Sequence, residues 1–151
     1  RRIMKWITRE RPKIDRIACP WLVSRFVDAK PEFLYVPPDD VMKISAETGA
    51  MPYDVQGIEL GHHGDRCSFD AFIDKYDLTD VALLRLGEIV RAADTGRPQD
   101  APEATGLLAI SRGLSLVFQN DHEMLEHGMV IYDALYAACG GDPNRTPIAK
   151  G

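Results

Sequence analysis

The strongest constraint on the fold is a helical spacing of apolar side chains that starts at Ser68 and recurs in successive segments as far as Cys139. Ser68 has the short hydroxyl side chain typical of a helix N-cap, and apolar residues follow it at i, i+3, i+4 and i+7. Further segments begin at residues that can cap a helix, namely Asp80, Asp100 and Asn120. The pattern therefore predicts that the C-terminal two thirds of the chain is helical.

The helix expected from Asp100 carries Gly106 and Gly113 on one face. A glycine inside a helix costs ~1 kcal/mol relative to alanine, so its presence needs a reason. We expect that these two glycines allow another helix to pack closely against this face.

The first 60 residues favour short strands. Residues 5–8 (KWIT) and 32–37 (EFLYVP) read as two strands, and residues 52–60 read as a broken third strand or a hairpin. Because strands and helices do not alternate regularly as βαβ units, the sequence predicts an α+β fold that is mostly α-helical. We expect a small N-terminal sheet of about three short strands, followed by a helical C-terminal bundle.

Two helices are expected between these strands. Asp15 is the predicted N-cap of a helix that runs to about Asp28, with Pro20 near its first turn, where proline costs least. Asp39 or Asp40 would cap a shorter helix that ends at Gly49.

Length and composition predict one domain. A chain of 151 residues that is 45% hydrophobic can bury a sizeable core, which we place in residues 4–139, with residues 140–151 as a flexible tail. No apolar run approaches the ~18 residues of a membrane-spanning helix, and no signal-peptide h-region is present. We therefore expect no membrane partner and a cytoplasmic location. The three cysteines show no C-x-x-C spacing, which excludes a disulfide framework and a cysteine-rich zinc module.

The charge is distributed unevenly. A net charge of −5 argues against nucleic acid as the main partner, yet seven of the 18 Lys and Arg residues lie in the first 16 positions. A solvated basic face explains this segment most simply. The functional alternative is an anion-binding segment, with Arg9 and Arg16 as its candidate residues.

Residues 120–128 (NDHEMLEHG) come close to two zinc signatures, H-E-x-x-H and H-x-x-E-H, without matching either. On a helical wheel, His122 and Glu126 share one edge of the apolar face, at the i, i+4 spacing with which helices present metal ligands. Asp133 lies two turns further along this edge and could orient a ligand. A solvated His–Glu pair explains the same residues equally well.

Glu123 and His127 have a structural explanation. Asn120 and Glu123 match an N-x-x-E capping box, in which each side chain serves the other residue's backbone N–H. His127 follows Glu123 at the spacing of a favourable helix pair. We therefore expect both residues to contribute to stability.

The best source of a third metal ligand is residues 61–72 (GHHGDRCSFDAF). If the alternation of a preceding strand continues, His62 points inward and His63 outward. The predicted metal ligands are therefore His62, His122 and Glu126. Asp15, Asp94 and Asp133 are additional ligand or second-shell candidates, and the metal would be Zn²⁺, Fe²⁺ or Mn²⁺.

Cys67 stands beside the start of the predicted helix at Ser68. A helix N-terminus lowers the pKa of a thiol, so Cys67 is a candidate redox thiol or ligand. The simpler interpretation is a buried, inert cysteine.

Several motifs in order resemble the chromate-resistance domain family over residues 4–139. They are KWITRERPKIDRIACPWL, EFLYVPPDDV, CSFDAFIDKYDLTD, LLRL-EIVRAADTG and DHEMLEHGMVIYDALYA. The resemblance implies a role in the response to chromate or heavy metals, and in regulators of the family it implies sensing linked to transcription. In those regulators DNA binding is attributed to a preceding region, so we expect no direct nucleic-acid binding by this chain. The resemblance does not assign metal ligands.

Three function classes remain open. The first is a metal-binding, oxyanion-responsive domain whose partner is a small oxyanion such as chromate. The second is a metal-dependent redox or hydrolytic enzyme with an open coordination position. The third is a regulatory interaction domain without metal. Formation of a homo-oligomer is compatible with each.

Overall fold

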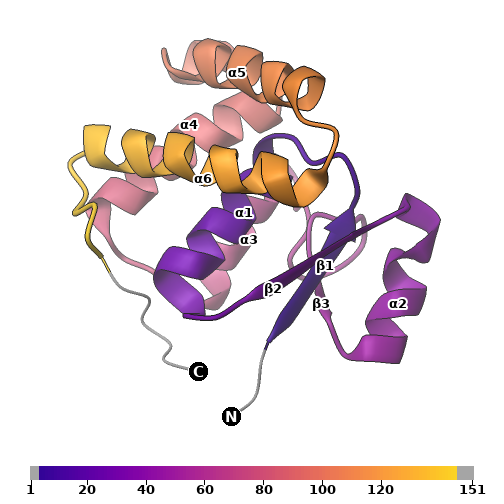
Figure 1. The fold of residues 1–151 in the computed structure, drawn as a ribbon. Helices are drawn as coiled ribbons and strands as arrows, with labels where there is room; N and C mark the ends of the chain where they lie inside the picture. Colours follow the sequence, from indigo (N-terminus) through magenta and orange to yellow (C-terminus); the bar gives the residue numbers. More distant parts are fainter. Residues whose placement is uncertain (1–3, 146–151) are drawn as a thin grey trace.

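Three short parallel strands form the sheet of this protein, whose computed structural model describes residues 4–145 (Figure 1). The strands are β1 (Lys5–Arg9), β2 (Glu32–Val36) and β3 (Met51–Pro52), in the order β2-β1-β3. The predicted number of strands is confirmed. The predicted extent of the third is wrong, because the backbone after Pro52 turns instead of continuing as a strand or hairpin.

Helices connect the strands on opposite faces of the sheet. The chain passes from β1 to β2 through α1 (Ile14–Leu22) and the π-helical turn η1 (Val23–Val27). It passes from β2 to β3 through the 3₁₀ turn η2 (Pro38–Asp40) and α2 (Val41–Thr48). In Figure 1, α2 lies on the other side of the sheet from the remaining helices. This region therefore does alternate as βαβαβ, which the sequence analysis did not expect.

Side-chain alternation along β1 produces the two faces. Trp6 belongs to the main hydrophobic core, whereas its neighbour Ile7 packs with Val41 and Ala50 on the α2 side. Both β1 side chains are fully buried, which is typical of a parallel sheet covered on both faces.

The rest of the chain is helical, as predicted, and the fold class α+β with mostly α-helix is confirmed. The elements are α3 (Ser68–Lys75), α4 (Val81–Asp94), η3 (Pro98–Asp100), α5 (Ala104–Val117) and α6 (Asp121–Ala138). The predicted caps Asp80 and Asn120 are confirmed, since their side chains accept the N–H groups of Leu83 and Glu123 at 2.9 and 3.0 Å. The predicted starts at Ser68 and Asp100 are wrong: Cys67 is the N-cap of α3, and α5 begins only after η3.

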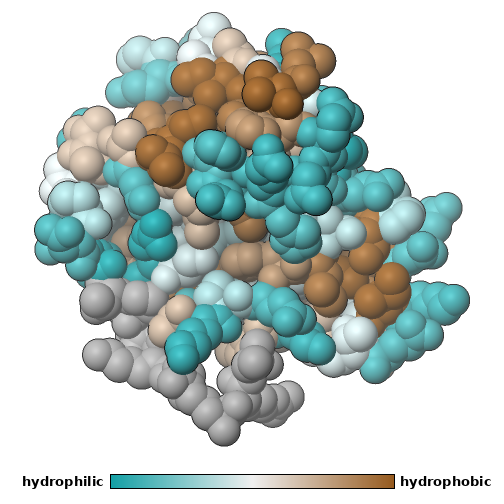
Figure 2. All heavy atoms as spheres, in the orientation of Figure 1, coloured by the Kyte–Doolittle hydropathy of each residue, from teal (hydrophilic) through white to brown (hydrophobic). Residues whose placement is uncertain are grey.

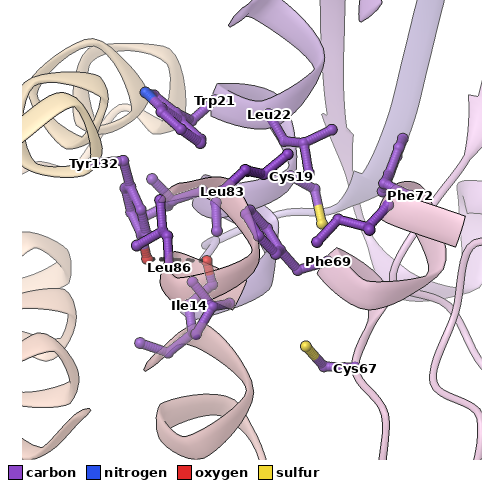
Figure 3. Close-up of a cluster of buried hydrophobic side chains, with 14 of the residues drawn as sticks. Ile14, Cys19, Trp21, Leu22, Cys67, Phe69, Phe72, Leu83, Leu86 and Tyr132 are labelled. Atoms are coloured by element: carbon purple, nitrogen blue, oxygen red, sulfur yellow. Dashed lines mark hydrogen bonds between the residues drawn. The ribbon is translucent and has the colours of Figure 1, made fainter. Parts of the chain in front are cut away.

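Helix α1 lies at the centre of the helical layer. Its contacts reach α3, α4, α5 and α6, and most of its residues are buried. Figure 3 shows Trp21 and Leu22 from this helix together with Phe69, Leu83 and Tyr132 from the surrounding helices. Full burial of an aliphatic or aromatic side chain of this size contributes about 1.5–3 kcal/mol. The packing therefore fixes the start of α1, which carries Asp15.

A hydrogen bond from the sheet replaces the one that α1 loses at its internal proline. Pro20 was predicted to lie near the first turn of its helix, but it is the third residue from the end of α1. Proline has no N–H and leaves the carbonyl oxygen four residues earlier without its helical donor. That oxygen, of Arg16, instead accepts the hydroxyl of Tyr35 in β2 at 3.0 Å. The proline therefore leaves a carbonyl oxygen of α1 free to accept a hydrogen bond from β2.

Apolar side chains remain exposed on α5 and α6. Figure 2 shows apolar residues gathered over α5, where Ile110, Leu116 and Val117 are exposed, together with Val130 of α6. None of the helices within residues 4–145 is both long enough and apolar enough to span a lipid bilayer.

The close helix packing predicted for Gly106 and Gly113 is wrong for the described residues, because a Cβ at either position would meet no atom within 4 Å. Gly128 of α6 has this role instead: a Cβ there would lie 2.6 Å from Cγ2 of Ile17 in α1. The close approach of α6 to α1 therefore requires glycine at position 128.

We expect Gly128→Ala to lower the free energy of unfolding by about 1–3 kcal/mol, because overpacking against Ile17 outweighs the gain in helix propensity. The matched control is Gly113→Ala, which meets open space and should raise stability by up to ~1 kcal/mol. Urea unfolding followed by circular dichroism measures both variants. Equal effects of the two substitutions would contradict this assignment.

Candidate functional site

The carboxyl ends of the three parallel strands meet at one edge of the sheet. Arg9 ends β1, Pro38 follows β2 and Asp54 follows β3. At this edge the chain leaves β1 for α1 on one face and leaves β2 for α2 on the other face. In open parallel sheets, ligands bind in the crevice where the connections diverge in this way. The topology therefore makes this edge of the sheet the expected position of a ligand site.

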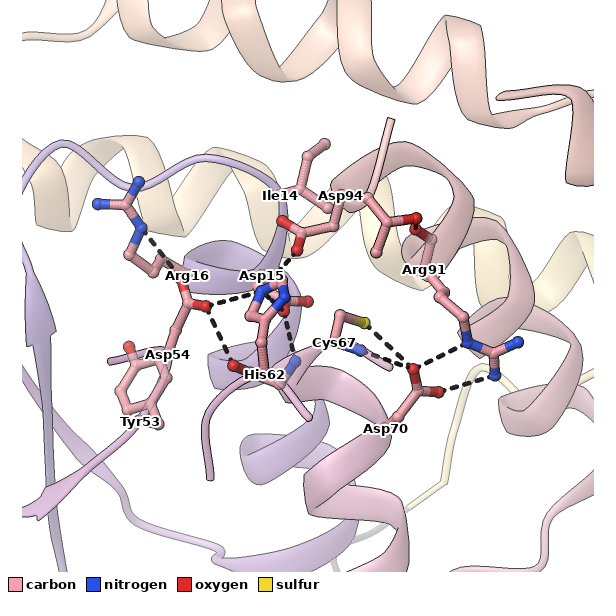
Figure 4. Close-up of polar contacts among 12 residues, drawn as sticks. Ile14, Asp15, Arg16, Tyr53, Asp54, His62, Cys67, Asp70, Arg91 and Asp94 are labelled. Carbon is pink, nitrogen blue, oxygen red and sulfur yellow. Dashed lines mark hydrogen bonds and ion pairs between the residues drawn. The ribbon is translucent and has the colours of Figure 1, made fainter. Parts of the chain in front are cut away.

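Four side chains from three segments converge there: Asp15 of α1, Asp54 and His62 of the long loop after β3, and Asp94 of α4 (Figure 4). His62 Nε2 lies 2.9 Å from Asp94 Oδ2, 3.4 Å from Asp54 Oδ1 and 3.6 Å from Asp15 Oδ2. One imidazole nitrogen thus faces three carboxylates.

Asp15 is the most deeply buried of the four, with a side chain that is 0% exposed. It does not cap its own helix, as predicted, since Lys13 is the N-cap of α1 and makes no side-chain cap. Its Oδ2 instead accepts the backbone N–H of Ser68, at the start of α3, at 2.7 Å. Its Oδ1 is buried without a hydrogen-bond partner in the described residues. A buried acceptor left unpaired costs about 1–3 kcal/mol.

Asp54 is held by arginines. Its Oδ2 lies 3.3 Å from Nη2 of Arg9 and 3.3 Å from Nε of Arg16, and its Oδ1 accepts the Ser68 hydroxyl at 3.0 Å. Its backbone has a φ of 51°, in the left-handed region that non-glycine residues seldom adopt. Arg9 and Arg16, the predicted anion-binding residues, do lie at this site, but each already pairs with Asp54.

The sequence analysis did not single out Asp54. The available signal was its place directly after a strand, in the segment PYDVQG, where loops often carry functional side chains. Because residues 52–60 were interpreted as strand or hairpin, that signal was missed.

Asp94, one of the additional ligand candidates from the sequence, is the last residue of α4. Its side chain is only 17% exposed and contacts His62. Burial, followed by the charge of Asp54, raises the pKa of Asp94, although His62 opposes this. Burial, followed by the charges of Asp94 and Asp54, likewise raises the pKa of Asp15 well above its ordinary value. The site therefore concentrates more negative charge than its surroundings readily stabilise.

His62 points toward the carboxylates and His63 points away from them, as predicted, but strand alternation is not the reason. Residues 61–67 form a loop, so strand alternation does not apply. His62 nevertheless faces the carboxylates with its side chain 44% exposed, whereas Nε2 of His63 lies 2.8 Å from the carbonyl oxygen of Glu59.

Potential ligand atoms of Asp15, His62 and Asp94 all lie within 4.8 Å of one another. Two carboxylates and one imidazole form a donor set that suits Mn²⁺, Fe²⁺ or Zn²⁺. The geometry thus contains a possible cation position, with Asp54 beside it.

The structure does not bring His122 and Glu126 to this position. Both are exposed on α6, and the His122 ring packs edge-on against Tyr35, with ring centroids 5.5 Å apart. Asp133 accepts hydrogen bonds from the indole of Trp21 and the guanidinium of Arg25, so it does not orient His122. The helical wheel places His122 and Glu126 at the edge of the apolar face, but that edge is exposed to solvent, where an unpaired polar group costs little.

The residues interpreted as structural have simple contacts. The N–H of Glu123 donates to the Asn120 side chain, while His127 stacks on Phe118 with ring centroids 4.4 Å apart. His127 therefore packs on an aromatic ring, and no ion pair with Glu123 is formed in the described residues.

Cys67 lies behind the site and is fully buried. Burial raises the pKa of its thiol, followed by the charges of Asp15 and Asp70. The expected pKa-lowering effect of the helix N-terminus does not prevail, because desolvation of a thiolate outweighs it. The structure thus favours the inert cysteine over the redox thiol.

Asp70 joins α3 to α4. Its carboxylate accepts the Cys67 N–H at 3.0 Å and forms a bidentate pair with Arg91, with both contacts at 2.9 Å. Arg91 lies one helical turn before Asp94, so this pair fixes the part of α4 that presents Asp94 to His62.

An open pocket of about 330 Å³ extends from these side chains to the start of α1. It is lined by Arg9, Lys13, Ile14, Asp15, Arg16, Asp54, His62, Ala93, Asp94 and Leu108. The acidic cluster is therefore accessible to a small ligand.

Fold and site together describe a small α+β domain with an acidic cluster at a sheet edge, and comparison with known proteins supplies its family. Residues 6–139 match the family model described as ChrB, C-terminal domain. The chain is also 34% identical over 133 residues to Protein ChrB of Cupriavidus metallidurans, an alignment that covers 87% of this chain and 40% of that protein. The chain belongs to the ChrB C-terminal domain family, which confirms the resemblance found in its motifs. It spans less than half of that relative's length. No solved structure matches significantly.

We expect Asp15→Asn to stabilise the metal-free protein at pH 7. The folded-state pKa of Asp15 is raised, so the folded protein loses stability as pH rises above the ordinary value of 3.8, and the amide removes this loss. Urea unfolding in chelator at pH 7 and at pH 4 should show a gain at pH 7 that shrinks at pH 4. The control is Asp39→Asn, at an exposed position. A loss of stability at pH 7 would contradict the prediction.

Proposed function

We propose that this ChrB-family domain binds a divalent transition metal through Asp15, His62 and Asp94, and that it acts in chromate resistance or its regulation. The observation that carries the metal proposal is that ligand atoms of Asp15, His62 and Asp94 lie within 4.8 Å of one another, while Oδ1 of the buried Asp15 has no hydrogen-bond partner in the described residues. A cation would satisfy this oxygen and offset the repulsion among the carboxylates.

The surroundings support a cation at this position. Asp15 is already oriented by the Ser68 N–H, so the geometry of its remaining oxygen is fixed. Asp54 is paired with two arginines, and its Oδ1 lies 3.4 Å from the same Nε2 of His62, so it adds a further carboxylate beside the proposed cation. Neutral imidazole is the ligand form, so metal binding would require an unprotonated His62 Nε2.

The family supports the wider role. ChrB-family membership points to chromate resistance or its regulation. We propose that a small oxyanion such as chromate is the effector, attracted by Arg9, Lys13 and Arg16 at the rim of the pocket. Any effect of this oxyanion on a longer protein that contains the domain is likewise part of the proposal.

A metal-dependent enzyme is the second candidate. Three protein ligands and an open pocket would leave a coordination position for water or substrate. Turnover of chromate by metal-loaded protein with a thiol reductant separates this candidate from a binding domain.

The test of the metal proposal compares three histidine variants prepared without a histidine tag. We expect His62→Ala to lower the affinity for Mn²⁺ or Zn²⁺ at least ~10-fold, the least that loss of a metal-orienting group usually costs. His63→Ala is the matched control, because the side chain of His63 bonds to the backbone oxygen of Glu59 and contributes no atom to the cluster in the described residues. His122→Ala should also retain metal, which distinguishes this site from the ligand set expected from the sequence alone.

Titration calorimetry with each metal and elemental analysis after dialysis measure the outcome. Metal loss in His122→Ala together with full occupancy in His62→Ala would refute the site. Wild-type protein that takes up no transition metal on reconstitution would favour the metal-free regulatory domain.

A further inference from the structure

The outward face of α5 is apolar along most of its length. Apolar residues recur there at spacings of three and four, the period of one helical face. The residues of this face are Gly106, Ala109, Ile110, Gly113, Leu116 and Val117. Leu116 and Val117 are 81% and 71% exposed, and the apolar patch over α5 is visible in Figure 2. Arg112 is the one charged residue of α5, so the face itself carries no charge.

The two glycines of this face have no close neighbour in the described residues. A Cβ at Gly106 or Gly113 would meet no atom within 4 Å. Glycine inside a helix lowers its stability relative to alanine, and its usual benefit is to let another backbone approach closely. Gly128 provides that benefit within the chain, at the contact of α6 with α1. The face of α5 combines glycines with exposed apolar side chains, but nothing within residues 4–145 covers it.

The face is complementary to itself when two copies of α5 run antiparallel. If the pair is centred between positions 111 and 112, Val117 of one copy lies opposite Gly106 of the other. Ile110 then lies opposite Gly113. Each branched side chain meets the open space beside a glycine, and a two-fold axis repeats both contacts. A parallel pair would instead place glycine opposite glycine and valine opposite valine.

Charges at the two ends of α5 favour the same arrangement. Glu103 is the N-cap residue of α5 and is exposed. At the other end, the guanidinium of Arg11 donates to the carbonyl oxygens of Ser115 and Gln119, both at 2.7 Å. An antiparallel pair brings the acidic end of each helix toward the basic end of the other and aligns the two helix dipoles favourably. Because the chain has a net charge of −5, two copies repel each other least at an uncharged face.

We propose that this face of α5 binds a second copy of the chain, with the two α5 helices antiparallel about a two-fold axis. Each copy then contributes the same residues, as an isologous interface requires. None of the six residues of the face lines the pocket at the acidic cluster, so the proposal does not depend on bound metal.

The size of the face determines how strong this dimer is. A helix of 14 residues is ~21 Å long and ~10 Å wide, so its outward half offers roughly 300 Å². Two such faces bury roughly 600 Å², about half the area of the smallest stable and specific interfaces. The dimer is therefore weak and forms only at high protein concentration, with a dissociation constant of roughly 10–100 µM.

Sedimentation equilibrium between ~5 µM and ~1 mM protein, without a tag, tests the proposal. We expect monomer at the lowest concentration and dimer at the highest. Leu116→Lys places a charge from each copy in the pair and should weaken association at least ~10-fold. Met42→Lys is the matched control, because Met42 is 51% exposed on α2, on the other side of the sheet, and it should leave association unchanged. Wild-type protein that stays monomeric at ~1 mM, or equal effects of the two lysines, would overturn the proposal.

Cysteine cross-linking tests the antiparallel register. Gly106→Cys and Val117→Cys are prepared as separate proteins, in which the three native cysteines are buried. When the two are mixed and oxidised, we expect a disulfide between position 106 of one copy and position 117 of the other. Val117→Cys alone should not cross-link, because its two copies lie ~16 Å apart along the helix axis and a disulfide allows a Cα separation of only ~7 Å. Absence of the mixed disulfide, or a disulfide of Val117→Cys with itself, would refute this arrangement.

Discussion

A single hydrogen bond, from the backbone N–H of Ser68 to the buried carboxylate of Asp15, joins the fold to its candidate site. It ties the first turn of α1 to the first turn of α3, two helices that are far apart in sequence and packed in the core. The Ser68 hydroxyl extends the tie to Asp54, and the Asp70–Arg91 pair extends it from α3 to α4. The positions of all three carboxylates therefore depend on the packing of α1, α3 and α4.

The same tie explains why the site can remain electrostatically unfavourable. Asp15 cannot move away from Asp94 without breaking the contact with α3 and disturbing the core around Trp21 and Leu22. Functional sites commonly retain such local conflict because the surrounding structure outweighs it. The buried, unpaired oxygen of Asp15 is the clearest sign of this conflict.

The fold was largely predictable because amphipathic helices carry their own signal. The spacing after Ser68 and Asn120 located α3 and α6 within one or two residues. The helix α2 was predicted from its cap residues and Gly49, but the parallel βαβαβ arrangement was not, because β3 has only two residues and is too short to show a period. The parallel pairing of β3 with β1 is visible only in three dimensions.

The site was predictable in part. His62, Asp15 and Asp94 were each named as candidates, but their convergence depends on how α1, α4 and the loop after β3 pack. A helical wheel identifies the face on which His122 and Glu126 lie, yet it cannot tell whether a partner faces them. In the structure that face is open to solvent, whereas Asp54, which was missed in the sequence, lies beside His62 in the site.

The edges of the small sheet are protected by proline. β2, one outer strand, is bounded by Pro31 and Pro37, and Pro52 lies in β3, the other outer strand. Proline offers no N–H to a further strand, and short outer strands give an incoming chain little backbone to pair with. Sideways growth of the sheet into strand-paired aggregates is thereby disfavoured. The protein can thus keep the ends of its strands open for a ligand without leaving their sides open to other chains.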